Sequence, residues 1–237
     1  MMKGWIYKEL RQNWIFVLAV VCMGMYPLLN ILCLKYTLND AGSLDSFRMF
    51  EPLCALSGVL VFHSSLLKMN ENKIWGYFVT STSSGYKGYL FVKYVIIFLM
   101  TILHLITVLI SNVLFINAES AKGISEFTAM PWLFVGYSCL QLLFCAVDLP
   151  FTVRFGVRNT TTFMAFLLIL FVIGFFIVMF NVISDINITP TEMFGKIREY
   201  EAPLILKLSV ILISLLAYWG SYFLSCRLYL KGVKYYR

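Results

Sequence analysis

Six long apolar stretches constrain the fold of this chain more than any other feature. A transmembrane helix needs about 20 mostly apolar residues to cross a hydrocarbon core about 30 Å thick. The second stretch is the shortest, but it carries no charge between Pro52 and Leu67. The pattern predicts an all-α, polytopic membrane protein with six transmembrane helices, at residues 14–34, 50–67, 92–116, 131–150, 162–183 and 204–226.

The composition supports a bilayer environment. Hydrophobic residues make up 60% of the 237 residues and charged residues only 13%. Soluble domains carry about 25% charged residues, and one of this length could not bury so much apolar surface. We therefore expect a single transmembrane domain over residues 1–237 and exclude a soluble enzyme.

The distribution of basic residues predicts the orientation. If the N-terminus is cytoplasmic, the cytoplasmic segments hold 13 of the 19 Lys and Arg residues and the external segments hold six. Three acidic residues fall inside and nine outside, so the net charge is 13 − 3 = +10 inside and 6 − 9 = −3 outside. Because basic residues concentrate on the cytoplasmic side, we expect a cell (plasma) membrane protein with both termini in the cytoplasm.

The segment before the first apolar stretch has the pattern of a short amphipathic helix. Its basic residues fall largely away from one apolar helical face, and tryptophan anchors well at the depth of the lipid headgroups. We predict an interfacial helix on the cytoplasmic side. The alternative is a simple basic flank that orients the first span. The face is formed by Trp5, Ile6, Leu10 and Trp14.

The sequence contains no motif for catalysis, for a cofactor or for a metal. Gly195-Lys196 comes nearest to a phosphate-binding loop, but it lacks the first glycine and the following Ser or Thr. The six cysteines form no Cys-x-x-Cys pair and are expected to be packing residues. The net charge of +7 belongs to the loops and indicates topology, so we expect no nucleic-acid partner.

A few polar side chains fall within the apolar stretches. Ionisable groups in a membrane are functional candidates, but we expect His63 and His104 to be neutral and bonded to a neighbouring helix. For Asp148 an ion pair with Arg154 or Arg158 is favoured over a proton relay. The sequence leaves open whether the amides bond between helices or line a path: Asn112, Gln141 and Asn181.

The cytoplasmic loop over residues 68–93 contains a tight apolar group. A loop exposed only to water has no need for such a group, which is typical of a short helix that docks on a partner. The alternative is a helix on the membrane surface. The group consists of Ile74, Trp75, Tyr77 and Phe78.

This loop resembles the permease subunit of a type-2 ATP-binding-cassette (ABC) exporter, of the small six-span kind common in Gram-positive bacteria. In that family a polar or acidic stretch after the second span leads to Trp/Tyr-x-x-Phe. A Ser/Leu-Pro-x-Ser stretch follows, and a Lys-Tyr pair opens the third span. Thr82-Ser83 stands where the family often has Leu-Pro. The residues that fit are Glu71, Lys73, Trp75, Phe78, Ser81, Ser84, Lys93 and Tyr94.

A second motif follows the fourth apolar stretch. The segment 149–156 is similar to the Leu-Pro-x-x-x-Lys/Arg-Phe-Gly segment of the same family. The basic N-terminal start and the basic C-terminal tail also fit. The residues of this second cytoplasmic motif are Pro150, Arg154, Phe155 and Gly156, followed by Arg158.

The resemblance implies a transport role without catalysis in this chain. Two permease subunits, identical or different, would pair above two copies of an ABC ATPase, which would bind ATP and Mg. The cargo would be a hydrophobic or amphipathic peptide, drug or lipid, exported across a bacterial cell membrane. The cytoplasmic coupling helix that contacts the ATPase would contain Glu71, Lys73, Ile74, Trp75, Tyr77, Phe78, Ser81 and Ser84.

Two other functional classes remain open on sequence. A passive channel needs polar or charged residues along the spans, and these are sparse here. A membrane anchor or sensor could also use the aromatic group of the 68–93 loop to dock a cytoplasmic protein. Copurification of an ATPase would separate these alternatives from the permease.

Overall fold

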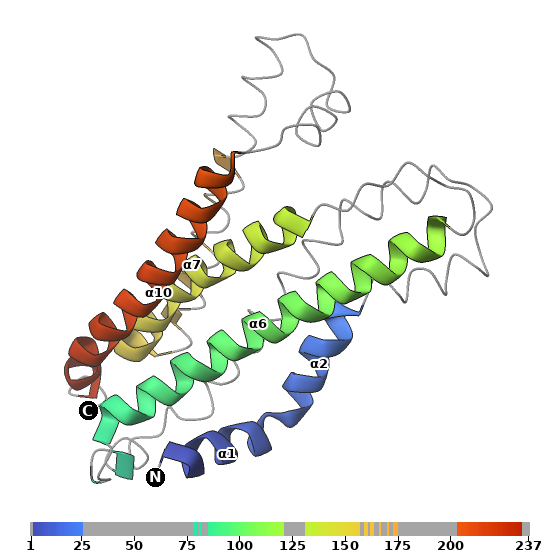
Figure 1. Ribbon diagram of the computed structural model, residues 1–237. Coiled ribbons are helices and arrows are strands. Elements are labelled where there is room, and N and C mark those ends of the chain that lie inside the picture. Colours follow the sequence, from blue (N-terminus) through green and yellow to red (C-terminus); the bar gives the residue numbers. More distant parts are fainter. Residues whose placement is uncertain are drawn as a thin grey trace.

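The fold is helical in every segment that the computed structural model describes. The described residues are 2–25, 78–79, 81, 85–120, 131–156, 159–160, 162–163, 166, 170, 173–174 and 203–233. No strand occurs in these residues. The all-α prediction is thus confirmed for this part of the chain. The five helices in Figure 1 are α1 (Met2–Gln12), α2 (Trp14–Gly24), α6 (Gly85–Ser120), α7 (Pro131–Phe155) and α10 (Leu204–Val233).

Three of these helices are long and apolar enough to cross a membrane: Gly85–Leu114, Phe134–Phe155 and Leu204–Tyr229. They coincide with the predicted third, fourth and sixth spans, so the chain is embedded in a membrane. Helix α2 is a shorter apolar helix that begins the first predicted span. The rest of that span, the second span and most of the fifth lie outside the described residues.

The helices extend further than the apolar stretches that predicted them. Helix α6 begins at Gly85, well before residue 92, and its 36 residues give a length of about 54 Å. This exceeds the hydrocarbon core of about 30 Å, so part of α6 projects beyond the apolar layer. Helix α10 likewise continues past residue 226 to Val233.

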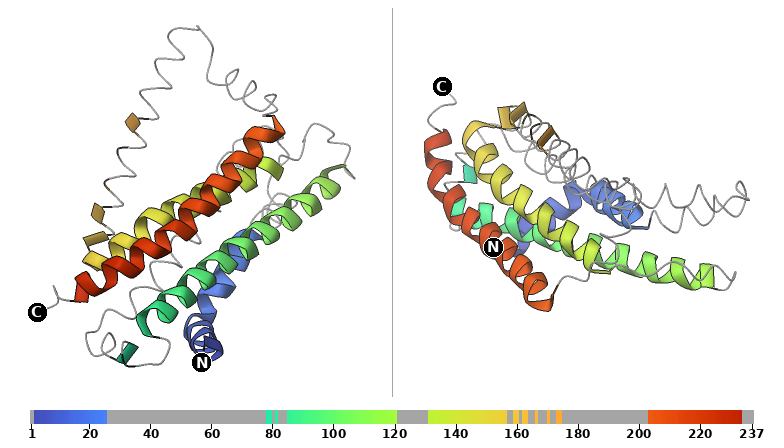
Figure 2. Two further views of the ribbon diagram at one scale, coloured as in Figure 1. Left: turned by 60° about the vertical axis from the view of Figure 1, so that its left-hand side comes forward. Right: turned by 90° about the horizontal axis from the view of Figure 1, so that it is seen from above.

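The helices form a layered bundle in which neighbours differ in how closely they pack. Helices α7 and α10 lie side by side over most of their lengths, while α2 packs on α6 (Figures 1 and 2). Helix α1 and the C-terminal end of α10 lie at the same end of the bundle (Figure 1). Shared buried side chains join α6 to α7 and α10, including Ile97, Leu149 and Tyr218.

A glycine permits the close approach of α2 to α6. A Cβ atom added at Gly24 would collide with the side chain of Thr107 and would lie 3.4 Å from the backbone nitrogen of Val108. Helices in membranes associate largely through this kind of close packing at small residues. Gly24 therefore fixes where α2 crosses α6.

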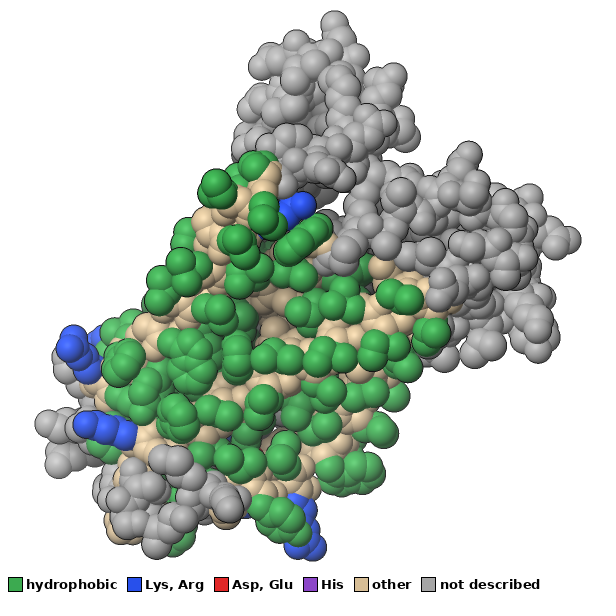
Figure 3. Space-filling view, viewed as in Figure 1, with side chains coloured by type: hydrophobic (Ala, Val, Ile, Leu, Met, Phe, Trp, Pro, Cys, Tyr) green, Lys and Arg blue, Asp and Glu red, His purple; other side chains and the backbone are tan. Residues whose placement is uncertain are grey.

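The outer surface of the bundle is apolar. Large hydrophobic side chains of α10 point outward, among them Ile205 at 82% exposure and Phe223 at 66%. Figure 3 shows hydrophobic side chains over most of the described face. Soluble proteins rarely expose such extended apolar patches, whereas lipid tails solvate them, in agreement with the three spans.

Candidate functional site

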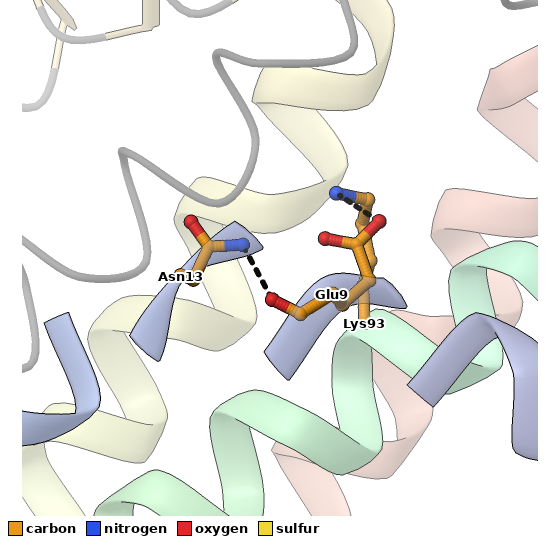
Figure 4. Close-up of polar contacts among 3 residues, drawn as sticks. All are labelled: Glu9, Asn13 and Lys93. Carbon is orange, nitrogen blue, oxygen red and sulfur yellow. Dashed lines mark hydrogen bonds and ion pairs between the residues drawn. The ribbon is translucent and has the colours of Figure 1, made fainter. Parts of the chain in front are cut away.

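A buried ion pair joins the N-terminal helix α1 to helix α6. The Lys93 Nζ atom of α6 lies 3.7 Å from Glu9 Oε1 of α1, and both side chains are 2% exposed. Figure 4 shows the two side chains meeting between the helices, with the Asn13 amide donating a hydrogen bond of 2.8 Å to the Glu9 carbonyl oxygen. Removing one member of such a pair leaves an uncompensated buried charge.

An aromatic pair lies beside this ion pair. The Lys93 ammonium lies 5.0 Å from the centroid of the Tyr89 ring, a favourable cation–π distance. The Trp5 ring packs edge-on against Tyr89, with 5.6 Å between centroids. Helix α1 is thus held by α6 through both charge and packing.

Sequence reasoning missed this pair, although two signals were present. Glu9 is the only acidic residue in the basic segment 2–13, and Lys93 is the only charged residue between 92 and 116. Each is unexpected in its surroundings, and together they are complementary. Nothing in a single sequence, however, indicates that two residues 84 positions apart are in contact.

The four residues of the predicted interfacial face have different environments. Trp5 and Ile6 are half-buried and pack against the protein core. Helix α1 ends at Gln12, so Trp14, which is 60% exposed, belongs to α2. Leu10 is 37% exposed. The helix itself is present, and its position at the membrane interface stays a prediction.

Two residues of the predicted coupling helix fall within the described part of the chain. Phe78 is 52% exposed and packs edge-on against Trp5 of α1, with 6.4 Å between ring centroids. The Ser81 hydroxyl donates a 2.8 Å hydrogen bond to the Phe78 carbonyl oxygen. Six further residues lie outside the described ones: Glu71, Lys73, Ile74, Trp75, Tyr77 and Ser84.

Val79 belongs to a buried cluster that we name the cytoplasmic junction, after the orientation predicted from the basic residues. Its side chain is fully buried, beside Tyr89 and Leu90 of α6 and Cys226 of α10. The same cluster brings the start of α6, the end of α7 and the last turns of α10 onto one segment. The partly buried residues packed against it are Trp5, Tyr86, Val153, Tyr222 and Tyr229.

The second cytoplasmic motif forms the end of α7. Pro150 lies inside the helix, which ends at Phe155. Gly156 then adopts a positive φ of 82°, a conformation that favours glycine at a helix C-terminus. Arg154 stacks over the Phe155 ring at 4.9 Å. Val153 of this segment packs against the cytoplasmic junction. Arg158 is outside the described residues.

Hydroxyl groups join α6 to α10 beside the ion pair. The Tyr94 hydroxyl lies 2.7 Å from Ser225 Oγ and 3.0 Å from Ser221 Oγ. The Tyr218 hydroxyl donates a 2.7 Å hydrogen bond to the Tyr94 carbonyl oxygen. Tyr218, Ser221 and Ser225 are spaced by three and four residues and so share one face of α10. The Lys-Tyr motif thus has a structural basis, because each residue binds a different helix.

Hydrogen bonds account for some of the buried polar side chains inside the spans, whereas Ser111 Oγ and Gln141 Nε2 have no hydrogen-bond partner among the described residues. The His104 Nδ1 atom lies 3.3 Å from the Val20 carbonyl oxygen of α2, which confirms the predicted bond to a neighbouring helix. Asp148 is buried near the end of α7, and its ion pair with Arg154 or Arg158 stays a prediction. Among the described residues, no group of three or more His, Cys, Asp or Glu side chains could hold a metal ion.

The comparison with known families agrees with the two motifs and the apolar helices. The chain matches the family described as ABC-2 family transporter protein over residues 43–230. This range includes both cytoplasmic motifs and the three described spans, but not α1 or α2. No curated protein and no solved structure matches the chain. Because the match covers most of its length, the chain belongs to the ABC-2 transporter family and is a membrane-embedded permease component of an ABC transporter.

Proposed function

We propose that this chain is the transmembrane subunit of an exporter that moves a hydrophobic or amphipathic cargo, such as a peptide, drug or lipid, out of a bacterial cell. Membership of the family implies association with ABC ATPase partners. In the proposed complex, two ATPase copies bind ATP and Mg beneath a pair of permease subunits. The observation that carries the proposal is the cytoplasmic junction around Val79.

The junction is suited to spreading a force from the 71–84 segment. Phe78 and Val79 contact α1 through Trp5 and α6 through Tyr89, while Cys226 belongs to α10. Well-packed interiors have low compressibility, so a displacement of this segment moves all these helices rather than deforming one contact. Such rigid-body motion is a common basis for alternating access and switching.

Phe78 has the exposure that a coupling residue needs. One side of its ring contacts Trp5, and 52% of its surface remains available to a partner. The same side chain can therefore contact an ATPase groove and α1 at once. Aromatic side chains are enriched among the residues that dominate interface energies.

The spans favour an apolar cargo over an ion. Helix α6 carries no charged residue from Tyr94 to Leu114, and α10 carries none from Leu208 to Ser225. Ion pathways are lined by carbonyl groups, charged rings or polar side chains. This distribution supports the exporter and argues against the passive channel.

Copurification tests the proposal. The chain is isolated from its native membranes in mild detergent, bound proteins are identified by mass spectrometry, and Mg-ATP hydrolysis is measured. We expect an ABC ATPase to copurify and hydrolysis to disappear when it is removed. Movement of cargo without ATP would support a channel, and a stably bound partner without ATPase activity would support an anchor or sensor.

A further inference from the structure

A small cavity between α6 and α7 is the starting point. It is separate from the cytoplasmic junction and includes polar groups that the proposed coupling does not use. The cavity has a volume of about 10 Å³, counted as the space in which the centre of a water molecule fits. Its walls include His104 and Val108 of α6 and Phe134, Tyr137, Ser138 and Gln141 of α7.

The cavity lies near the middle of the membrane. His104 follows Lys93 by eleven residues, which is about 16 Å along α6. Gln141 follows Pro131, at the opposite end of the bundle, by ten residues, which is about 15 Å along α7. Both distances are about half of a hydrocarbon core of about 30 Å. Lipid carbonyl and phosphate groups, which lie at the interface, are therefore too distant to reach the cavity.

Gln141 supplies a hydrogen-bond donor to this cavity. Its side chain is 2% exposed, and its buried Nε2 atom has no hydrogen-bond partner among the described residues. Burying an amide without a partner costs several kcal/mol by transfer estimates, and the bilayer core offers no solvent to replace it. The donor therefore indicates an acceptor that binds within the cavity.

The other wall groups define which acceptor fits. The Ser138 hydroxyl donates to the Phe134 carbonyl oxygen at 3.1 Å, so its remaining capacity is that of an acceptor. The described walls carry no carboxylate for a cation and no Lys or Arg for an anion, and their other polar side chains are Tyr137 and His104, whose Nδ1 atom lies 3.3 Å from the Val20 carbonyl oxygen. A neutral molecule that accepts from Gln141 and donates to Ser138 matches this set, and the volume is about that of one water molecule.

We propose that this cavity binds a single water molecule at the middle of the membrane, held by Gln141 and Ser138 between α6 and α7. The water accepts a hydrogen bond from Gln141 Nε2 and donates one to Ser138 Oγ. It satisfies the buried amide and supports the contact of the third span with the fourth. The proposal is independent of the ATPase and the cargo.

Radiolytic hydroxyl-radical labelling of the full chain in lipid nanodiscs tests the water site. Radicals form from water itself, so buried side chains are oxidised only where water lies beside them. Mass spectrometry should show oxidation of Phe134 and Tyr137, which line the cavity. The fully buried Tyr94 and Tyr218, which lie outside it, should stay unlabelled.

Two variants remove the water in different ways. Gln141→Leu deletes the donor at similar volume, and Val108→Leu fills the cavity while keeping the donor. Each should abolish the oxidation of Phe134 and Tyr137. Thr101→Val is the matched control, because the Thr101 hydroxyl bonds within α6 to the Ile97 carbonyl oxygen, and it should leave the labelling unchanged.

Three outcomes would overturn the proposal. The first is a native chain in which Phe134 and Tyr137 are not oxidised. The second is oxidation that persists in both Gln141→Leu and Val108→Leu. The third is equal oxidation of Tyr94, which would indicate general penetration of water into the bundle.

Discussion

Lys93 and Tyr94 are consecutive residues of α6, yet their side chains bind different helices. The Lys93 ammonium pairs with Glu9 of α1, whereas the Tyr94 hydroxyl bonds to Ser221 and Ser225 of α10. Adjacent positions on a helix point about 100° apart, so the dipeptide ties α6 to two neighbouring helices at one level. Lys93 and Tyr94 lie about one helical turn from Tyr89 and Leu90 of the cytoplasmic junction. A displacement of the loop before α6 would therefore move them as well.

The first prediction concerns the ion pair of Glu9 and Lys93. Glu9→Gln leaves the buried ammonium without its carboxylate, and we expect a loss of about 3–5 kcal/mol in the free energy of unfolding. Lys93→Met should have a comparable effect. The double variant should recover much of the loss, because no buried charge remains unpaired. Unfolding in detergent micelles, measured for all four proteins, gives the coupling energy.

Arg11→Gln is the control for the ion pair. Arg11 lies on the same helix but is exposed, so its removal should change stability by less than about 0.5 kcal/mol. If the losses from Glu9→Gln and Lys93→Met simply add in the double variant, the two side chains do not interact in the folded protein.

The second prediction concerns the contact of α2 with α6. Gly24→Ala places a methyl group against the Thr107 side chain, so we expect α2 to move away from α6 and the melting temperature to fall. The additional variant Thr107→Ala should restore part of the loss. Gly220→Ala is the control, because a Cβ there meets nothing within 4 Å. A melting temperature that is the same for Gly24→Ala and Gly220→Ala would contradict the described packing.

The third prediction concerns topology. Cysteines introduced at Ser43, Ser120 and Thr191 should react with an impermeant thiol reagent added to intact cells. Cysteines at Ser83 and Asn159 should react only after the cells are opened. The basis is the excess of basic residues on the predicted cytoplasmic side, 13 against six. Labelling of the Ser83 position from outside would invert the orientation and remove the coupling loop from the ATPase side.

The three described spans were predictable from the sequence because the membrane imposes one length on them. The fourth span is the clearest example: Pro131 begins both the apolar stretch and α7, as expected for proline in a first helical turn. The start of α6 was less predictable. A helix can continue beyond the apolar layer, where its residues need not be apolar. Lys87 lies in this extension of α6, so hydropathy does not mark it as part of the helix.

The contacts that assemble the end of the bundle around Val79 were not predictable from the sequence. Phe78 was assigned to a partner protein from its apolar character, and that assignment remains open. The sequence could not indicate that its ring packs edge-on against Trp5, because the two residues are far apart along the chain. Tyr229 is similar: it looked like part of a basic tail, yet its ring stacks on Tyr86 at 5.3 Å and 2°.

The fourth prediction addresses the coupling of the loop to an ATPase. Glu71, Trp75 and Phe78 are spaced by four and three residues, so they share one face if this segment is helical. Truncation of a buried aromatic anchor often costs about 2 kcal/mol or more, roughly thirtyfold in affinity. The double variant Trp75→Ala with Phe78→Ala should therefore lose its ATPase while still inserting into the membrane.

A matched control separates this effect from a general loss of aromatic side chains. Tyr7→Ala with Phe223→Ala also removes two rings, which are 65% and 66% exposed and lie outside the cytoplasmic junction. Tyr229 is unsuitable as a control, because it packs against the junction itself.

The most direct test is the amount of ATPase that copurifies per permease chain, compared between the native protein, the loop double variant and the Tyr7/Phe223 control. The account predicts that the native protein and the control retain the ATPase, while the loop variant loses most of it at equal membrane yield. Full retention of a functional ATPase by the Trp75→Ala, Phe78→Ala variant would contradict the coupling role of this loop.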